Sequence, residues 1–229
     1  MRAVISFYLE PVAYLIYLGS IFLYSWKNPG DTRFRFLLVY YFIASVFMAK
    51  ANIHRHGTSN ILLYDLMFLF TSIALGFYFF SVLSTLWKRA LIFFLCSFEI
   101  VYFVLNKFIF KSAPLFDSTG YVILSTGIVI MIFMFMHQIL SNVSDKSLLV
   151  NFEFWYVASL MIYFLGSFVI FLTFGYLTRK ILPAQLYSNE NRDLLTAVWG
   201  VHNVLLFLGS LLTLGSLVWI SFRKKLQSS

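Results

Sequence analysis

The chain has 229 residues, of which 61% are hydrophobic, 21% aromatic and 11% charged, and its formal net charge is +8. Soluble domains carry about 25% charged residues, so this composition excludes an ordinary soluble fold. The basic residues fall in ones, twos and threes between apolar runs, which argues against a nucleic-acid partner and is typical of anchors at a membrane interface. The composition therefore predicts an integral membrane protein whose main partner is the lipid bilayer.

Seven apolar runs are each long enough to span a bilayer, which takes about 20 helical residues. The runs cover residues 4–25, 34–51, 61–86, 90–110, 118–141, 153–178 and 194–222. They are apolar on every face, whereas the strands of a membrane barrel alternate polar and apolar residues. We therefore predict an all-α bundle of seven transmembrane helices that forms one domain over residues 1–229.

The segments between the runs are short and contain loop-forming residues. They cover residues 27–33, 52–60, 87–89, 111–117, 142–147 and 179–193, and none is large enough for a soluble domain. The basic cluster Arg223, Lys224 and Lys225 directly follows the last run and favours a cytoplasmic C-terminus. With seven spans, the N-terminus then lies on the opposite side of the membrane.

Cysteine and histidine are too few or too poorly spaced to predict a metal site. Cys96 is the single cysteine, and it lies inside an apolar run. His54 and His56 are two residues apart in a predicted loop, a spacing that fixes no ligand geometry. We therefore expect no metal and no cofactor, and no motif of an intramembrane enzyme is present, so no catalytic residue is predicted.

Polar residues near the ends of the runs are interpreted first as interface residues. Glu10 precedes Pro11 early in the first run, and we expect its carboxylate to lie at the membrane interface. His137 and Gln138, near the end of the fifth run, are expected there too. Asp65 lies about one turn into the third run and fits an interface position or a functional one equally well.

Glu99 lies in the middle of the fourth run. Tyr102 and Asn106 follow it at i+3 and i+7, so the three side chains share one helix face. A carboxylate at that depth must face the bundle interior, a water-filled cavity or a partner. Two interpretations remain open for this face: hydrogen bonding that holds helices together, or a ligand site.

The last run carries Trp199, His202 and Asn203 at i, i+3 and i+4, about two turns inside the membrane. A neutral imidazole has one donor and one acceptor, and both need partners at that depth. We predict that His202 and Trp199 line a polar pocket shared with Tyr163 of the preceding run. The alternative is interhelical hydrogen bonding without a pocket, along a stripe that continues through Leu206, Gly209 and Thr213.

The last two runs resemble the seven-helix membrane regions of Bacteroidetes-type bacterial signalling proteins. In that group a Phe-Trp pair opens the sixth helix, a Tyr-Phe-x-Gly segment follows, and Trp-x-x-His helps to open the seventh. Here the matching residues are Phe154, Trp155, Tyr163, Gly166, Trp199 and His202. The resemblance implies a sensory or signal-relaying unit in the bacterial inner membrane, with a sensor kinase or another signalling protein as a partner.

Three functions are compatible with these features. The preferred one is a sensor that binds a small or lipid-like ligand among the third, fourth, sixth and seventh helices and shifts a two-state bundle. The alternative is a small transporter or channel subunit, although neither an internal repeat nor helices broken at mid-membrane are evident. An enzyme is the least favoured. The candidate ligand-binding residues are Glu99, Tyr102, Asn106, Trp155, Tyr163, Trp199, His202 and Asn203.

Overall fold

The fold is known from a computed structural model, which describes residues 2–53, 61–109, 117–141, 148–180 and 189–228. Within these ranges the chain is almost entirely helical and contains no strand, which confirms the all-α prediction. His54, His56 and most of the predicted loops at 52–60, 111–117, 142–147 and 179–193 lie outside the described residues.

The helices lie close to the predicted runs. They are α1 (Arg2–Lys27), α2 (Arg33–Ile53), α3 (Ile61–Val82), α4 (Leu86–Val104), α5 (Ser118–Ser141), α6 (Phe152–Lys180) and α8 (Asn189–Ser228). A π-helical turn at Leu105–Ile109 continues α4, and a 3₁₀ turn at Leu148–Val150 precedes α6. The long apolar runs of the sequence therefore located the seven described α-helices.

One predicted connection is wrong. Residues 87–89 belong to the first turns of α4, and the chain instead turns at residues 83–85, where we had extended the third run. The side chain of Gln138 stabilises the turn at residues 83–85. Its amide nitrogen donates to the Val82 carbonyl (3.0 Å), and its oxygen accepts from the backbone N–H of Ser84 (3.0 Å). Gln138 thus binds a turn of the chain, while the adjacent His137 is exposed.

The last two helices are also longer than we predicted. Arg179 and Lys180 still belong to α6, and residues 189–193 already belong to α8, although we had assigned all of them to a loop. The predicted tail after residue 222 continues α8 to Ser228. Charged and polar residues extend both helices beyond their apolar parts.

Six helices are long and apolar enough to cross a membrane, so the chain is a multi-pass membrane protein. They are α2, α3, α4, α5, α6 and α8. Helix α1 is not among them; the side chains of this helix are described only from Tyr8 onward. The seventh span therefore remains a prediction, and so does the side of the membrane on which the C-terminus lies.

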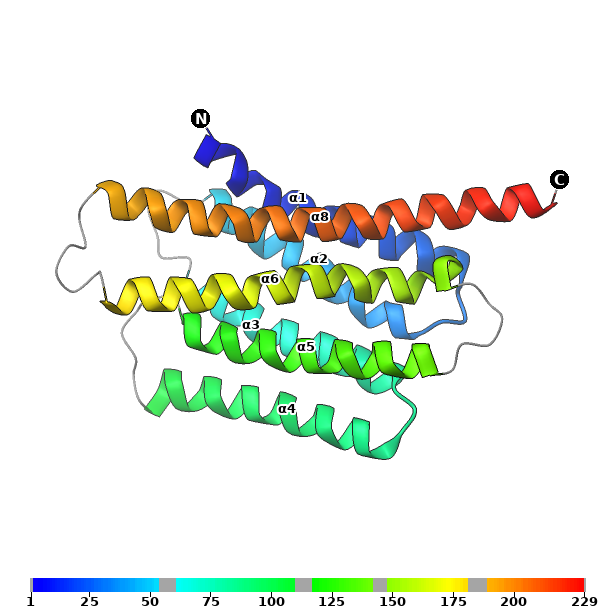
Figure 1. The fold of residues 1–229 in the computed structure, drawn as a ribbon, viewed down its shortest axis with the longest axis horizontal. Coiled ribbons are helices and arrows are strands. Elements are labelled where there is room, and N and C mark those ends of the chain that lie inside the picture. Colours follow the sequence, from blue (N-terminus) through cyan, green and yellow to red (C-terminus); the bar gives the residue numbers. More distant parts are fainter. Residues whose placement is uncertain (1, 54–60, 110–116, 142–147, 181–188, 229) are drawn as a thin grey trace.

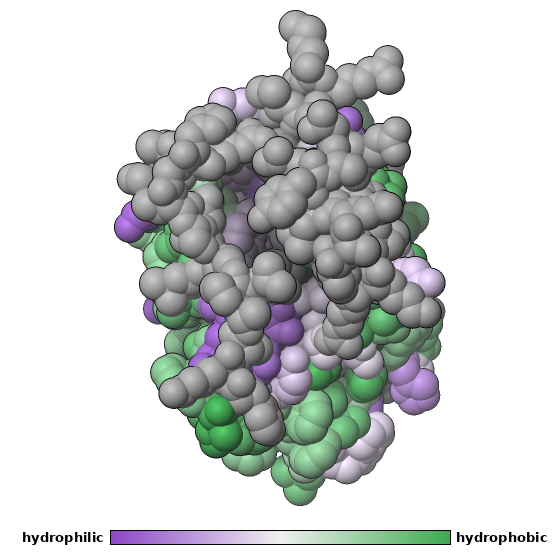
Figure 2. Space-filling view, turned by 90° about the vertical axis from the view of Figure 1, so that its left-hand side faces the viewer, coloured by the Kyte–Doolittle hydropathy of each residue, from purple (hydrophilic) through white to green (hydrophobic). Residues whose placement is uncertain are grey.

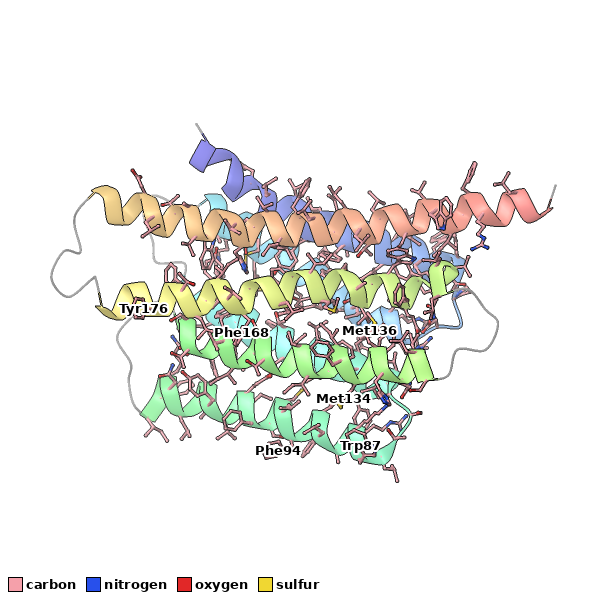
Figure 3. All side chains as sticks on the ribbon, viewed as in Figure 1. Trp87, Phe94, Met134, Met136, Phe168 and Tyr176 are labelled. Carbon is pink, nitrogen blue, oxygen red and sulfur yellow. The ribbon has the colours of Figure 1, made fainter. Side chains whose placement is uncertain are left out.

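Six of the helices form a closed ring. The contacts run from α1 to α2, α3, α5, α6 and α8, and α8 returns to α1, while α4 packs outside the ring against α3 and α5 (Figure 1). Helix α4 accordingly has the smallest share of buried residues among the six spans. Phe94 and Trp87 are about 60% exposed and point away from the bundle (Figure 3), as lipid-facing side chains should.

Small residues bring α8 close to its neighbours. A Cβ atom at Gly209 would lie 2.6 Å from the Tyr17 hydroxyl and 3.0 Å from the Ser159 carbonyl, so glycine is required there. Thr213 donates a hydrogen bond to Ser159 (2.9 Å), and Tyr17 donates to the same hydroxyl from α1 (3.1 Å). The predicted stripe on this helix therefore forms the contact among α1, α6 and α8.

Candidate functional site

A small internal cavity lies inside the ring, in the half of the bundle that contains the N-terminus. All six ring helices line it, and α4 contributes nothing. The lining residues are Glu10, Tyr14, Tyr40, Met48, Tyr64, Met67, Thr71, Tyr121, Leu124, Ser125, Tyr163, Phe164, Phe171, Trp199 and His202. Its free volume is about 20 Å³, enough for roughly one water molecule. The surrounding side chains therefore nearly fill the cavity.

Hydrophilic side chains are visible at this end of the molecule. Figure 2 views the molecule from the left-hand side of Figure 1; purple residues lie in the lower centre and at the outer edges, with green hydrophobic residues between them.

His202 is deeply buried in the cavity wall. It is 3% exposed, its Nε2 lies 3.2 Å from the Tyr163 hydroxyl, and its Nδ1 lies 3.0 Å from the Ser167 hydroxyl. A hydroxyl donates or accepts as required, so one serves the N–H and the other the bare nitrogen of a neutral imidazole. The predicted partnership of His202 with Tyr163 is thus present, and Ser167 is a second partner that the sequence did not single out.

Aromatic rings surround the imidazole. The Trp199 ring centre lies 5.2 Å from that of His202, and Phe171 packs at 5.0 Å. Tyr64 meets Trp199 edge to face at 5.5 Å. These contacts bring together α3, α6 and α8, and the expected pocket of Trp199, His202 and Tyr163 exists as part of the cavity.

Glu10 was placed at the interface by the sequence analysis, and this is wrong. Its side chain is 6% exposed and lines the cavity, where its Oε2 accepts a hydrogen bond from the Tyr64 hydroxyl (3.4 Å). Tyr14 and Tyr17 follow at i+4 and i+7, and both are buried. This periodicity was the available sign that Glu10 belongs to the inward face of α1.

Glu99 lies apart from the cavity. It is 1% exposed, as its predicted inward orientation requires, and its Oε2 accepts from the Ser72 hydroxyl (2.5 Å). Its other oxygen lies against Gly127 of α5, in the space that a side chain at this position would fill. Glu99 therefore joins α4 to the ring between α3 and α5, and it does not share a site with His202.

Tyr102 and Asn106 form hydrogen bonds with a different residue from the one that Glu99 binds. Asn106 donates to one carboxylate oxygen of Asp117 (2.5 Å) and Tyr102 donates to the other (3.3 Å). Asp117 also accepts from the Gly120 N–H at the start of α5 (3.0 Å). Nearby, Asp65 forms an ion pair with Lys107 (2.8 Å). These interactions bind the end of α4 to the bundle.

Two further candidates lie away from the cavity. Trp155 is partly exposed near the start of α6, where its indole N–H donates to the Leu149 carbonyl (3.0 Å). This position fits an aromatic anchor at the membrane interface. Asn203 is fully buried in α8, but it is not part of the cavity lining. Of the eight candidate residues, the structure brings three together: Tyr163, Trp199 and His202.

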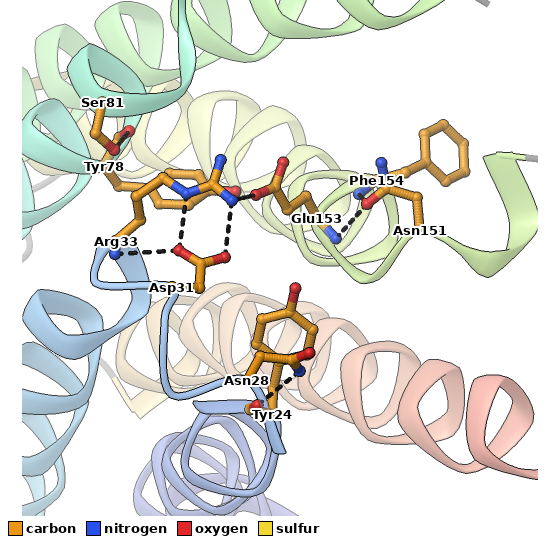
Figure 4. A network of polar contacts seen from close by, with 9 residues as sticks. All are labelled: Tyr24, Asn28, Asp31, Arg33, Tyr78, Ser81, Asn151, Glu153 and Phe154. Atoms are coloured by element: carbon orange, nitrogen blue, oxygen red, sulfur yellow. Dashed lines mark hydrogen bonds and ion pairs between the residues drawn. The ribbon is translucent and has the colours of Figure 1, made fainter. Parts of the chain in front are cut away.

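The opposite end of the bundle contains a charged network that the sequence analysis did not identify (Figure 4). Arg33 at the start of α2 binds Asp31 through two nitrogens (2.8 and 2.7 Å). One of these also contacts Glu153 at the start of α6 (2.5 Å). Arg33 and Glu153 are 120 residues apart, so no local spacing predicted the pair. The network ties two helix starts together.

The described residues contain no group of three or more His, Cys, Asp or Glu side chains able to hold a metal ion. The cavity is lined mainly by aromatic and other apolar side chains, with a few polar groups among them. Comparisons with protein-family models, with curated proteins and with solved structures found no match to this chain.

Proposed function

We propose that this multi-pass membrane protein is a sensory or signal-relaying unit of the inner membrane, in which a small ligand enters the cavity and shifts the bundle between two packings. One observation carries the proposal: a cavity lined by aromatic side chains and a few polar groups lies where all six ring helices meet. A ligand that enlarges this cavity must move several helices against each other. A binding event is thereby converted into a rearrangement of the whole ring.

Helix α8 provides a route from the cavity to the other end of the molecule. It carries Trp199 and His202 in the cavity wall and continues to Ser228. Forty residues of helix are about 60 Å long, compared with about 30 Å for the hydrocarbon core of a bilayer. Its C-terminal end extends beyond the other helices (Figure 1), where it is available to a signalling partner. The resemblance of the last two spans to signalling proteins supports the same role.

The test is a distance measurement between the far ends of α8 and α4. Leu226 and Leu86 are 62% and 83% exposed, so both accept spin labels after replacement by cysteine in a Cys96→Ser background. His202→Ala then removes the side chain that binds both Tyr163 and Ser167 in the cavity wall. If the cavity controls the bundle, this change shifts the distance distribution at the far end, as measured by pulsed electron resonance in nanodiscs.

The matched control is Val201→Ala, because Val201 is the preceding residue of the same helix and is 53% exposed to lipid. It should leave the distribution unchanged. Identical distance distributions for the labelled parent chain, His202→Ala and Val201→Ala would contradict a relay. A transporter would instead open an aqueous path, so labelling of a cysteine at Thr71 by an impermeant reagent from the C-terminal side would favour transport.

A further inference from the structure

Among the described residues that line the cavity, Glu10 has the single carboxyl group, and this group has no charged partner. Glu10 is buried, and in the described part of the chain no ion pair reaches it; the three described pairs involve other carboxylates. A buried carboxylate is costly unless it is protonated or paired with a cation. The Tyr64 hydroxyl supplies one hydrogen bond at 3.4 Å, which is too long to compensate for lost hydration.

The neighbouring imidazole does not fill this role. Both nitrogens of His202 are occupied by hydroxyls, those of Tyr163 and Ser167, and neither hydroxyl requires a doubly protonated ring. No lysine or arginine is among the described residues that line the cavity. The cavity thus offers a negative or neutral environment and no cationic group that would bind an anion.

Aromatic side chains make up most of the remaining lining, including Tyr14, Tyr64 and Trp199. The faces of such rings attract cations, most strongly when water is excluded, and cages of this type bind alkylammonium ligands in many proteins. A carboxylate together with several aromatic rings is therefore a set of groups suited to a positively charged nitrogen.

We propose that the cavity binds a small ammonium-type cation, an ammonium ion or a short primary amine, between the Glu10 carboxylate and the aromatic rings of Tyr64 and Trp199. This inference rests on the proposed function, because it names the ligand of the same cavity. The free volume of about 20 Å³ fits an ion the size of a water molecule. Binding should therefore weaken as methyl groups are added.

The experiment uses a chain in which Trp199 is the single tryptophan, with the other four of the five replaced by phenylalanine. The protein in nanodiscs is titrated with ammonium, methylammonium and tetramethylammonium chloride at constant ionic strength, with sodium chloride as the reference salt. We expect a saturable change of Trp199 emission for the two smaller cations. Glu10→Gln removes the carboxylate that would pair with these cations, so its affinity for them should be about tenfold lower or more.

Glu99→Gln is the matched control, since it removes the other deeply buried carboxylate without touching the cavity. Its affinity should stay within about twofold of the parent. Calorimetric titration of the unmodified chain and of both Glu→Gln variants gives the same comparison if the single-tryptophan chain fails to fold. Binding that persists undiminished in Glu10→Gln overturns the proposal, and so does the absence of saturable binding in the folded parent.

The two proposals fail separately. If the ammonium series gives no binding while His202→Ala still shifts the far-end distance, the cavity controls the bundle but takes another class of ligand. If ammonium binds and the far-end distance never changes, the binding site stands and the relay is wrong.

Discussion

The two ends of the bundle deal with buried polar groups in different ways. At the Arg33 end, one guanidinium faces two carboxylates at 2.5–2.8 Å, and at the same end the ring of Tyr24 packs against those of Phe34 and Phe152. At the cavity end, neutral hydroxyls satisfy His202, and Glu10 has one long hydrogen bond next to free space. The first end joins helix starts through ion pairs, and the second contains a small cavity and a buried carboxyl group that has no ion pair among the described residues.

The largest expected effect is at the charged end. Arg33→Met leaves Asp31 and Glu153 without their shared cation. The side chains are 13–36% exposed, so the cost lies between the ~1 kcal/mol of exposed pairs and the ~3–5 kcal/mol of buried ones, at about 2 kcal/mol. Thermal unfolding in detergent measures it. Arg35→Gln, which alters an exposed side chain two residues further along α2, should change stability by less than about 0.5 kcal/mol.

The next effect in size is expected where α8 packs against α1 and α6. Gly209→Ala places a methyl group against Tyr17 and the Ser159 carbonyl, and such overpacking costs about 1–3 kcal/mol. Gly215→Ala, six residues further along the same helix, meets nothing within 4 Å and should be neutral or stabilising by up to about 1 kcal/mol. Equal melting temperatures for the two variants would refute the close approach of α8 to its neighbours.

Within the cavity wall, the two partners of His202 should differ. Ser167 is fully buried and does not line the cavity, so Ser167→Ala leaves Nδ1 without a partner and costs about 1–2 kcal/mol. Tyr163 does line the cavity, so water can replace its hydroxyl in Tyr163→Phe, at a cost of about 0.5 kcal/mol. Chemical denaturation of both variants checks the order. The reverse order would place the free space on the other side of the imidazole.

Local patterns in the sequence were enough to predict the helices and one face of α8. Trp199, His202 and Tyr163 were found because polar groups on an apolar helix have one orientation that hides them. The role of Glu10 was missed, because it depends on Tyr64, 54 residues away, and on how α1 packs against α3. The same holds for Arg33 and Glu153: ion pairs between distant segments depend on tertiary packing.

Glu99 teaches a related lesson. Helical spacing correctly grouped it with Tyr102 and Asn106, but the three side chains bind different neighbours, Ser72 and Asp117. The central position of Glu99 in its apolar run therefore predicted its burial, but it did not predict which residues share a site with it. The closed ring, with α4 outside it, was not encoded in any local pattern, and it decides which polar residues share the cavity.

The most direct test of the difference between the two ends is the same substitution at each, Glu10→Gln and Glu153→Gln, with the free energy of unfolding measured for both. Glu153→Gln removes a charge from Arg33 and should lower stability by about 1 kcal/mol. Glu10→Gln replaces a buried carboxyl group that has no cationic partner in the described chain with a neutral amide, and stability should stay equal or rise. Equal losses of stability at both positions would contradict the account, because Glu10 would then be a structural residue like Glu153.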